Sequence, residues 1–299
     1  MSSVWRERQE RGTRWVMHLY LAIAVYGGRT FSRAVMAMTC FYFLATAPEA
    51  RAASREFLTR ALGRNASLRD IYSHLVCFGT TLLDRIYLFT GHHDRLAIDI
   101  EGEEVLREKL ALGRGCLLFG SHLGSFELLG IVGSVSRGLP VNVVMNVDAN
   151  ANIQRILAEQ RGGLPYNVIE LGKPGAMIAV KECLERGEIV GLLVDRVYGS
   201  EATCVLPFLG SPAPFSLAPY QLAAITGAPV VMAYALLLGG NRYRVSFSPL
   251  ADRIERSRGE ACDGVLPWVQ RYVEGLESRA KEAPLNWFNF YDYWGASSR

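Results

Sequence analysis

The 299-residue chain lacks the sequence signatures of several large enzyme classes. No G-x-G-x-x-G follows an apolar run, which excludes the usual dinucleotide-dependent oxidoreductases. No G-x-S-x-G elbow is present, so a serine hydrolase built on that turn is not expected. The six cysteines form neither a C-x-x-C pair nor a zinc-ligand spacing, and His92-His93-Asp94 has no third ligand near it in sequence. We therefore predict reduced thiols and no metal site.

An apolar run of the roughly 20 residues that span a bilayer as a helix is also missing. Two shorter runs, residues 15–26 and 34–47, open the chain and are separated by Gly27-Gly28-Arg29. We predict a helical hairpin over 15–47 that dips into one leaflet of a membrane. The alternatives are two core helices, or a cleaved signal peptide, which the acidic residues near the N-terminus and the second apolar run disfavour.

Lysine is absent from the first 64 residues, which hold ten Arg and four acidic residues, a balance of +6. The whole chain carries +3, so the remainder is acidic by three charges. A basic, aromatic-rich front end is typical of attraction to anionic lipid, and no nucleic-acid-binding motif occurs. The mean hydropathy of +0.13 is high for a soluble enzyme and predicts apolar surface facing something other than water.

Residues 48–91 carry the signals of two helices. Pro48 suits a first helical turn and Gly63 suits the position just past a helix end. Ser67 and Asp70 form a capping-box-like start for the second helix, which we expect to run to about residue 91. We predict a helical N-terminal extension over 1–91, which includes the hairpin at 15–47.

From residue 95 onward, apolar runs alternate with helical patterns. Strands are predicted at 96–100, 115–120, 140–146, 166–171, 188–194, 229–238 and 242–249, and helices at 102–112, 125–137, 150–161, 174–186, 216–227 and 261–283. This alternation predicts an α/β fold with a mixed, mostly parallel sheet covered by helices on both faces. The last two strands are joined by three residues only, so they should pair antiparallel. We assign 92–299 to this α/β domain.

One segment, Cys116 to Gly130, combines residues that can carry chemistry. An apolar strand ends at Gly120, a Ser-His-Leu-Gly turn follows, and Ser125 suits the N-cap of the next helix. His122 should then project from the carboxyl end of a strand, where open α/β sheets bind ligands. Glu127 falls in the first helical turn, and we predict that its carboxylate pairs with the His122 imidazole.

Such a pair has a clear chemical use. A neutral imidazole takes a proton from an attacking hydroxyl, and the carboxylate fixes its tautomer and stabilises the cation that forms. The small residues Gly124 and Ser125 would leave room for substrate and for backbone donors near a reacting carbonyl. Spacing alone leaves the alternative that His122 and Glu127 form a structural pair.

The His122–Glu127 segment resembles the H-x4-D/E signature of the lysophospholipid acyltransferase superfamily, and specifically its lipid A late-acyltransferase branch. Further similar segments follow in the family's order: Gly191-Leu-Leu-Val-Asp195-Arg196, Val205-Leu-Pro-Phe208-Leu-Gly210-Ser-Pro-Ala, Thr226-Gly-Ala-Pro-Val-Val, and the aromatic C-terminus Asn286 to Trp294. Asn146 stands near the strand end where lipid A acyltransferases usually carry an Arg. The resemblance is thus closer to the predicted acyltransferases that accompany aryl polyene pathways, whose acceptor need not be lipid A.

The resemblance implies transfer of a fatty acyl group from an acyl carrier protein or coenzyme A thioester to a lipid or glycolipid acceptor, without cofactor or metal. It implies His122 as general base and Glu127 as its partner, at the cytoplasmic face of a bacterial inner membrane, as a peripheral or monotopic protein. The candidate substrate-binding residues are Gly124, Ser125, Asn146, Asp195, Arg196, Phe208 and Gly210.

Two other functions fit the same residues. A membrane-associated hydrolase or thioesterase would use the same histidine, with water in place of the acceptor. In a non-catalytic membrane-surface module the His122–Glu127 pair would be structural only. A raised His122 pKa and no cleft beside it would favour that module, whereas a groove leading to the hairpin would favour the enzyme.

Overall fold

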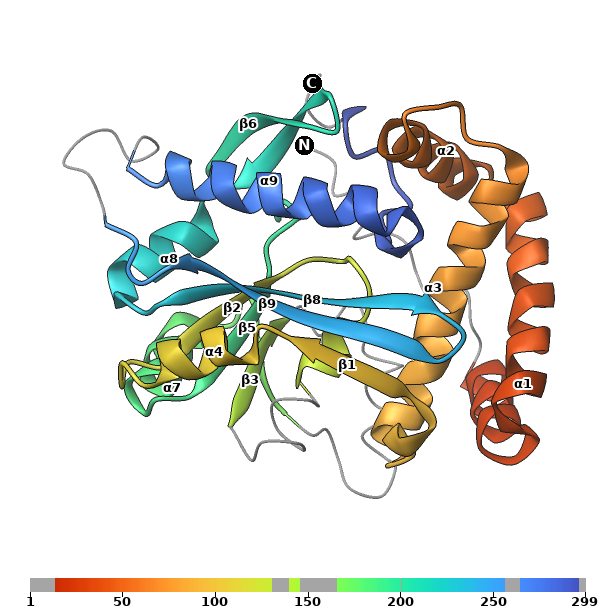
Figure 1. The fold of residues 1–299 in the computed structure, drawn as a ribbon, viewed down its shortest axis with the longest axis horizontal. Helices are drawn as coiled ribbons and strands as arrows, with labels where there is room; N and C mark the ends of the chain where they lie inside the picture. Colours follow the sequence, from red (N-terminus) through yellow and green to blue (C-terminus); the bar gives the residue numbers. More distant parts are fainter. Residues whose placement is uncertain (1–13, 131–139, 146–165, 200, 256–263, 296–299) are drawn as a thin grey trace.

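Seven strands form one sheet in the order β1-β9-β8-β2-β5-β3-β4 (Figure 1). The structure, a computed structural model, describes residues 14–130, 140–145, 166–199, 201–255 and 264–295. The strands are β1 (Ala97–Glu101), β2 (Cys116–Gly120), β3 (Val141–Met145), β4 (Asn167–Glu170), β5 (Ile189–Leu193), β8 (Val230–Gly239) and β9 (Arg242–Ala251). All neighbours are parallel except β8 and β9, which are antiparallel. The predicted mixed, mostly parallel sheet is therefore confirmed, including the closing hairpin.

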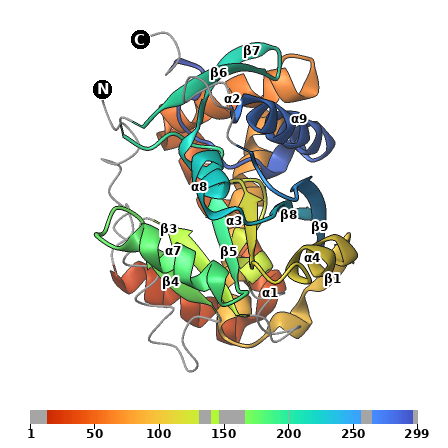
Figure 2. The same cartoon turned by 90° about the vertical axis from the view of Figure 1, so that its left-hand side faces the viewer.

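Both faces of the central strands of this sheet are buried. In β2, Leu117 and Phe119 belong to one apolar cluster, while Cys116 and Leu118 belong to another on the opposite face. The first face packs against α7 (Ala176–Glu185), α8 (Ala218–Thr226) and α9 (Leu266–Glu282), and the second against α3 (Leu68–Phe89) and α4 (Glu103–Leu110) (Figures 1 and 2). A strand buried on both faces needs an uninterrupted apolar run, which β2 has.

The N-terminal helices follow the signals in the sequence. Helix α1 (Arg14–Thr46) is broken at Gly28, where φ is 75°, a backbone angle that glycine adopts without steric cost. Helix α2 (Pro48–Leu62) starts on its proline and ends at a left-handed residue 63, and α3 starts with a complete Ser67–Asp70 capping box. None of the described helices is long and apolar enough to cross a membrane.

A two-stranded ribbon, β6 (Thr203–Phe208) and β7 (Ser211–Ser216), lies where no strand was predicted. Its turn places Leu209 and Gly210 at positive φ, as a two-residue hairpin turn requires. Three prolines within the ribbon concealed it, because proline is unusual inside a sheet. A lone ribbon consists of two edge strands, which tolerate prolines wherever their nitrogens face away from the partner. The predicted helix at 150–161 lies outside the described residues.

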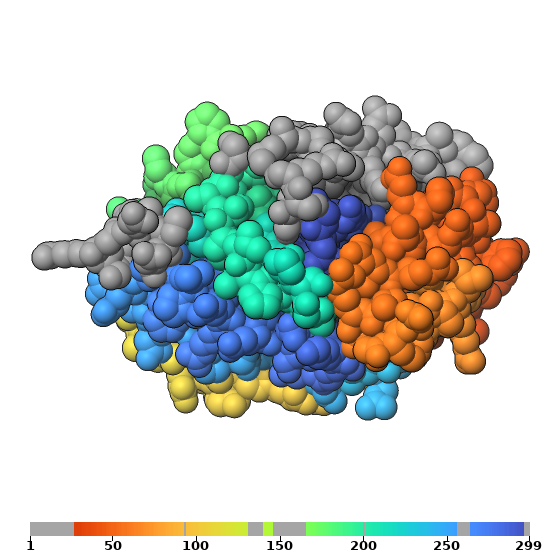
Figure 3. All heavy atoms as spheres, turned by 90° about the horizontal axis from the view of Figure 1, so that it is seen from above, coloured from red at the N-terminus to blue at the C-terminus, as the bar shows by residue number. Residues whose placement is uncertain are grey.

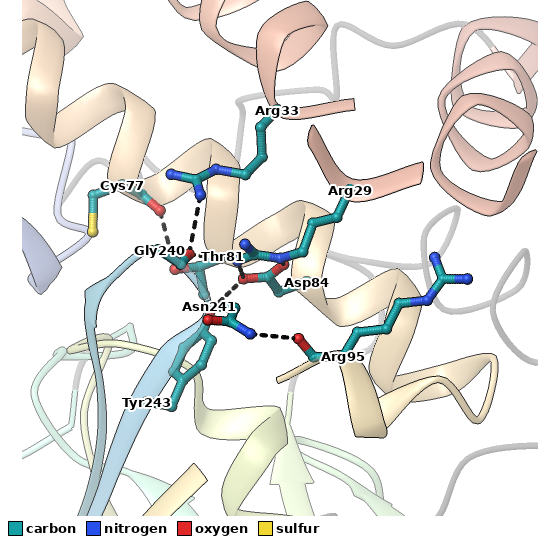
Figure 4. A network of polar contacts seen from close by, with 9 residues as sticks. All are labelled: Arg29, Arg33, Cys77, Thr81, Asp84, Arg95, Gly240, Asn241 and Tyr243. Atoms are coloured by element: carbon teal, nitrogen blue, oxygen red, sulfur yellow. Dashed lines mark hydrogen bonds and ion pairs between the residues drawn. The ribbon is translucent and has the colours of Figure 1, made fainter. Parts of the chain in front are cut away.

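A buried ion pair joins α1 to α3 and to the β8–β9 turn (Figure 4). The Arg29 guanidinium donates to both Asp84 oxygens at 2.9 and 2.8 Å and to the Gly240 carbonyl at 2.7 Å. The Tyr243 hydroxyl donates to the same carboxylate at 2.9 Å, and Arg33 also donates to Gly240. Only 1% of the Asp84 side chain is exposed, so this carboxylate depends on its protein partners.

We expect Asp84→Asn to lower the free energy of unfolding by about 3 kcal/mol, because it leaves the largely buried Arg29 charge uncompensated. Urea denaturation in mild detergent, followed by circular dichroism, measures this change. Asp252→Asn is the matched control, since Asp252 pairs with Lys109 but is 72% exposed, and its loss should leave the urea midpoint almost unchanged. Equal unfolding midpoints for the two variants would contradict the assignment of Asp84 as an anchor of α1.

Candidate active site

His122 lies at the carboxyl end of β2, two residues past the last strand residue. Its Nδ1 is 2.8 Å from Asp195 Oδ1, and its backbone N–H donates to Asp195 Oδ2 at 3.0 Å. Asp195 follows β5, which pairs with β2 in parallel and aligns Leu193 with Gly120. The segments that follow β2 and β5 leave the sheet side by side at the same edge, so the imidazole and the carboxylate meet there. The position predicted for His122 is therefore confirmed.

The carboxylate that contacts His122 is Asp195 and not Glu127, so the predicted pairing of His122 with Glu127 is wrong in this structure. Glu127 forms an ion pair with Arg85 of α3 instead. The prediction rested on closeness along the chain, whereas adjacency of parallel strands brings a residue 73 positions away to the imidazole. The sequence did hold the relevant signal, since an acidic residue directly after an apolar strand is unusual unless it has a partner.

Burial lowers the pKa of His122 below its ordinary value. The charge of Arg196 lowers it further, the Asp195 carboxylate opposes this, and the charge of Arg85 adds a smaller lowering effect. For Asp195, burial opposes ionisation, but the charge and hydrogen bonds of His122 outweigh it and hold the pKa of the carboxyl below its usual value.

At neutral pH the pair is accordingly a neutral imidazole beside a carboxylate. An ionised carboxylate only accepts hydrogen bonds, so His122 Nδ1 carries the proton and Nε2 keeps its lone pair. No hydrogen-bond partner for Nε2 is found among the described residues, and 22% of the His122 side chain is exposed. For a purely structural histidine we expected a raised pKa, whereas the pKa of His122 is lowered.

Asp195 and Arg196, both predicted to contact substrate, are held by the C-terminal residues. The Asp195 side chain is completely buried behind His122, and its Oδ2 accepts the Trp287 indole N–H at 3.0 Å. Arg196 donates to the Asn289 side chain at 2.9 Å and to the Phe288 carbonyl at 3.0 Å. Asp195 therefore acts on the imidazole, while Arg196 supplies a fixed positive charge near it.

Gly124 and Ser125 form part of the same loop. The Gly124 N–H donates to the Asn286 carbonyl and the Ser125 N–H to the Ala235 carbonyl, both at 2.8 Å. Gly124 has φ of 79°, and any side chain there would overlap the Ala235 carbonyl. The expected backbone donors of these two residues are thus already used within the protein. The Ser125 hydroxyl is buried without a partner among the described residues, so it does not cap the helix that begins at 126.

Two of the remaining candidates lie on the β6–β7 ribbon, and one lies outside the described residues. Phe208 is completely buried, and its ring centroid is 5.2 Å from that of Trp287. Gly210 forms the β6–β7 turn, and Asn146 is not among the described residues. Within the described ranges, no cluster of three or more His, Cys, Asp or Glu side chains is arranged to hold a metal ion.

The fold and this site define an α/β enzyme with a histidine–carboxylate pair at the carboxyl edge of a mostly parallel sheet. The sequence profile of the bacterial lipid A biosynthesis acyltransferase family matches residues 8–295. The chain therefore belongs to that family and is an acyltransferase, as its resemblance to the family implied. A comparison with curated individual proteins gave no match.

Proposed function

We propose that this acyltransferase moves a fatty acyl group from an acyl carrier protein or coenzyme A thioester to a hydroxyl or amine of a membrane lipid or glycolipid, with His122 as general base. The observation that carries the proposal is the orientation of the imidazole. Its Nδ1 is bound to a fully buried carboxylate, and its Nε2 has no partner among the described residues. This is the arrangement that a proton acceptor requires.

In the proposed reaction, Nε2 of His122 takes the proton from the acceptor hydroxyl as its oxygen attacks the thioester carbonyl. The Asp195 carboxylate stabilises the imidazolium that forms. Collapse of the tetrahedral intermediate breaks the carbon–sulfur bond, and the imidazolium returns its proton to the departing thiolate. All atoms and protons come from the two substrates and His122, so we propose that no cofactor takes part.

Two arginines place positive charge near His122. The charges of Arg196 and Arg85 both lower the pKa of His122, so both act electrostatically on the imidazole. Arg196 is held in place by Asn289 and by the Phe288 carbonyl, and Arg85 is paired with Glu127. Fixed charges of this kind stabilise an oxyanion without reorganisation. Substrate contacts by Gly124, Ser125, Asn146, Phe208 and Gly210 stay predictions.

An exposed apolar stripe on α1 supports binding at a membrane surface. Phe31, Met38, Phe41 and Tyr42 are 58%, 75%, 65% and 61% exposed. At 3.6 residues per turn, their spacing places all four on one helix face, within an arc of about 100° around the helix axis. Exposed apolar side chains gathered on one helix face are typical of helices that lie in the lipid interface. We propose peripheral or monotopic attachment at the cytoplasmic face of a bacterial inner membrane.

To test this proposal, the purified protein is mixed with vesicles of total bacterial lipid and a thioester that carries a labelled acyl chain. The acyl carrier protein thioester and the coenzyme A thioester are tested in separate reactions. A labelled lipid that forms only with vesicles and enzyme is the expected product, and it identifies the acceptor. Release of labelled free fatty acid alone would favour a thioesterase. No consumption of either donor by folded protein would favour the non-catalytic module.

Glu127→Gln should lower kcat/KM by roughly tenfold, much less than loss of the Asp195 charge, because the hydrogen bond between His122 and Asp195 stays intact. The change leaves Arg85 uncompensated, and its positive charge then lowers the His122 pKa further. The acid limb of the pH–rate profile should accordingly move to lower pH. A loss equal to that of Asp195→Asn would instead make Glu127 the carboxylate on which His122 depends.

A further inference from the structure

The C-terminal segment that follows α9 packs directly against the loop that carries His122. It consists of η3 (Pro284–Asn286) and residues 287–294. Asn286 accepts the Gly124 N–H, the Phe288 N–H donates to the His122 carbonyl at 2.8 Å, and Leu123 forms an antiparallel bridge with Trp287. The loop at 122–124 is therefore paired along its backbone, and its shape depends on residues more than 160 positions away.

Within this segment, Trp287 contacts the Asp195 carboxylate through its side chain. Its indole N–H donates to Asp195 Oδ2, the oxygen that also accepts the His122 backbone N–H, while Oδ1 faces Nδ1. Three donors thus hold one buried carboxylate in a single orientation. Without the indole, Oδ2 would keep only a backbone amide.

Packing sets the direction of the indole. Trp287 is completely buried, and its ring makes edge contacts with Phe57, Phe208 and Tyr293 at centroid distances of 4.8, 5.2 and 4.9 Å. These neighbours come from α2, β6 and the C-terminal segment itself. Figure 3 shows the β6–β7 ribbon and the N-terminal helices on either side of the C-terminal residues. The surrounding side chains therefore fix the orientation of the indole N–H. Because the ring is already immobilised, formation of the hydrogen bond costs little conformational entropy.

We propose that Trp287 is a positioning residue of this acyltransferase, whose indole N–H holds the Asp195 carboxylate in the orientation that binds His122. The inference rests on the proposed role of His122 as the base. This proposal gives the aromatic C-terminus a functional role. Through Trp287, the C-terminus contacts α2 and the β6–β7 ribbon as well as the carboxylate that binds His122.

The indole N–H also draws negative charge from Asp195. When this donor is removed, the His122 backbone N–H still holds Asp195 beside the imidazole. The carboxylate, with one donor fewer, then stabilises the imidazolium more strongly, so the pKa of His122 rises. The other charged groups that face His122 are Asp195 and Arg196 at the exit of β5 and Arg85 of α3, whose partner is Glu127. A substitution at Trp287 changes none of these charges, so an upward shift reports the loss of the donor.

The test compares Trp287→Phe with Trp294→Phe. Trp294 belongs to the same aromatic cluster, with ring centroids 6.0 Å from those of Trp287, and it donates its buried N–H to the Phe208 carbonyl. It therefore controls for the loss of a tryptophan and of a buried hydrogen bond. We expect Trp287→Phe to lower kcat on the order of tenfold, with KM for the acyl donor unchanged and the acid limb shifted to higher pH. Trp294→Phe should leave the pH profile unchanged.

A second readout does not depend on activity. The imidazole carbons of His122, labelled with ¹³C and followed by NMR, should titrate at higher pH in Trp287→Phe than in the wild type or in Trp294→Phe. An equal titration and an equal pH profile in the two variants overturn the inference, whatever the activity of the wild type. An inactive wild type whose His122 titration still depends on Trp287 overturns the proposed function only.

Should Trp287→Phe not fold, the wild type alone provides the test. In protein labelled with ¹⁵N at tryptophan, the Trp287 Nε1–H resonance should shift with pH at the midpoint of the His122 titration, because both groups share one carboxylate. A resonance that does not respond as His122 titrates overturns the inference.

Discussion

His122→Ala should reduce the rate of acyl transfer by about 10²- to 10⁴-fold, to the level that bound substrates reach without a base. No other group of the site can replace it, since Asp195 is fully buried behind the imidazole and Glu127 is bound to Arg85. The measurement is the initial rate of labelled lipid formation at saturating donor.

Two controls separate the loss of the base from the loss of the fold. The variant should keep the circular dichroism spectrum, the urea midpoint and the vesicle binding of the wild type. His92→Ala removes a different histidine, in the loop between α3 and η1 (His93–Arg95), and should keep full activity. Retention of more than about a tenth of the wild-type rate by His122→Ala would exclude general-base catalysis by this residue.

Asp195→Asn should cost about 10³-fold or more in kcat, although the side chain keeps its shape. An amide has a donor as well as an acceptor, so it permits the tautomer in which Nε2 carries the proton and cannot accept another. It also removes the charge that stabilises the imidazolium. Because the Asp195 carboxylate raises the His122 pKa, its loss moves the acid limb of kcat/KM to lower pH.

The comparison of Asp195→Asn with Glu127→Gln decides which carboxylate serves the histidine. The two substitutions are chemically identical, and each removes one negative charge from the neighbourhood of His122. Only the first removes an acceptor from Nδ1. Equal losses in the two variants would contradict the geometry, and a larger loss in Glu127→Gln would reverse the assignment.

The sequence predicted the parts of the site that depend on local pattern. The apolar run that ends at Gly120 identified β2, and the small residues after it placed His122 at the strand end. The partner was missed because the order of strands in the sheet is not encoded in any one segment. Once β5 is known to lie beside β2, Asp195 is the acidic residue that must meet His122.

The role of the C-terminus was beyond prediction for a similar reason. Residues 287–294 are rich in aromatic side chains without a helical or strand period, so nothing local indicated which surface they cover. Their position depends on the packing of Trp287 among three rings from separate segments. The β6–β7 ribbon was missed because its prolines conceal the pattern of a strand.

A single-turnover experiment tests whether His122 activates a membrane acceptor for direct attack on an acyl thioester. Excess wild-type enzyme or His122→Ala is mixed with labelled acyl carrier protein thioester and lipid vesicles, quenched at successive times, and analysed for labelled lipid, free acid and acylated protein. We expect labelled lipid from the wild type alone, formed at the rate at which thioester disappears and with no acylated protein. Equal lipid formation by His122→Ala, or a labelled protein that forms and decays before the lipid appears, would contradict it.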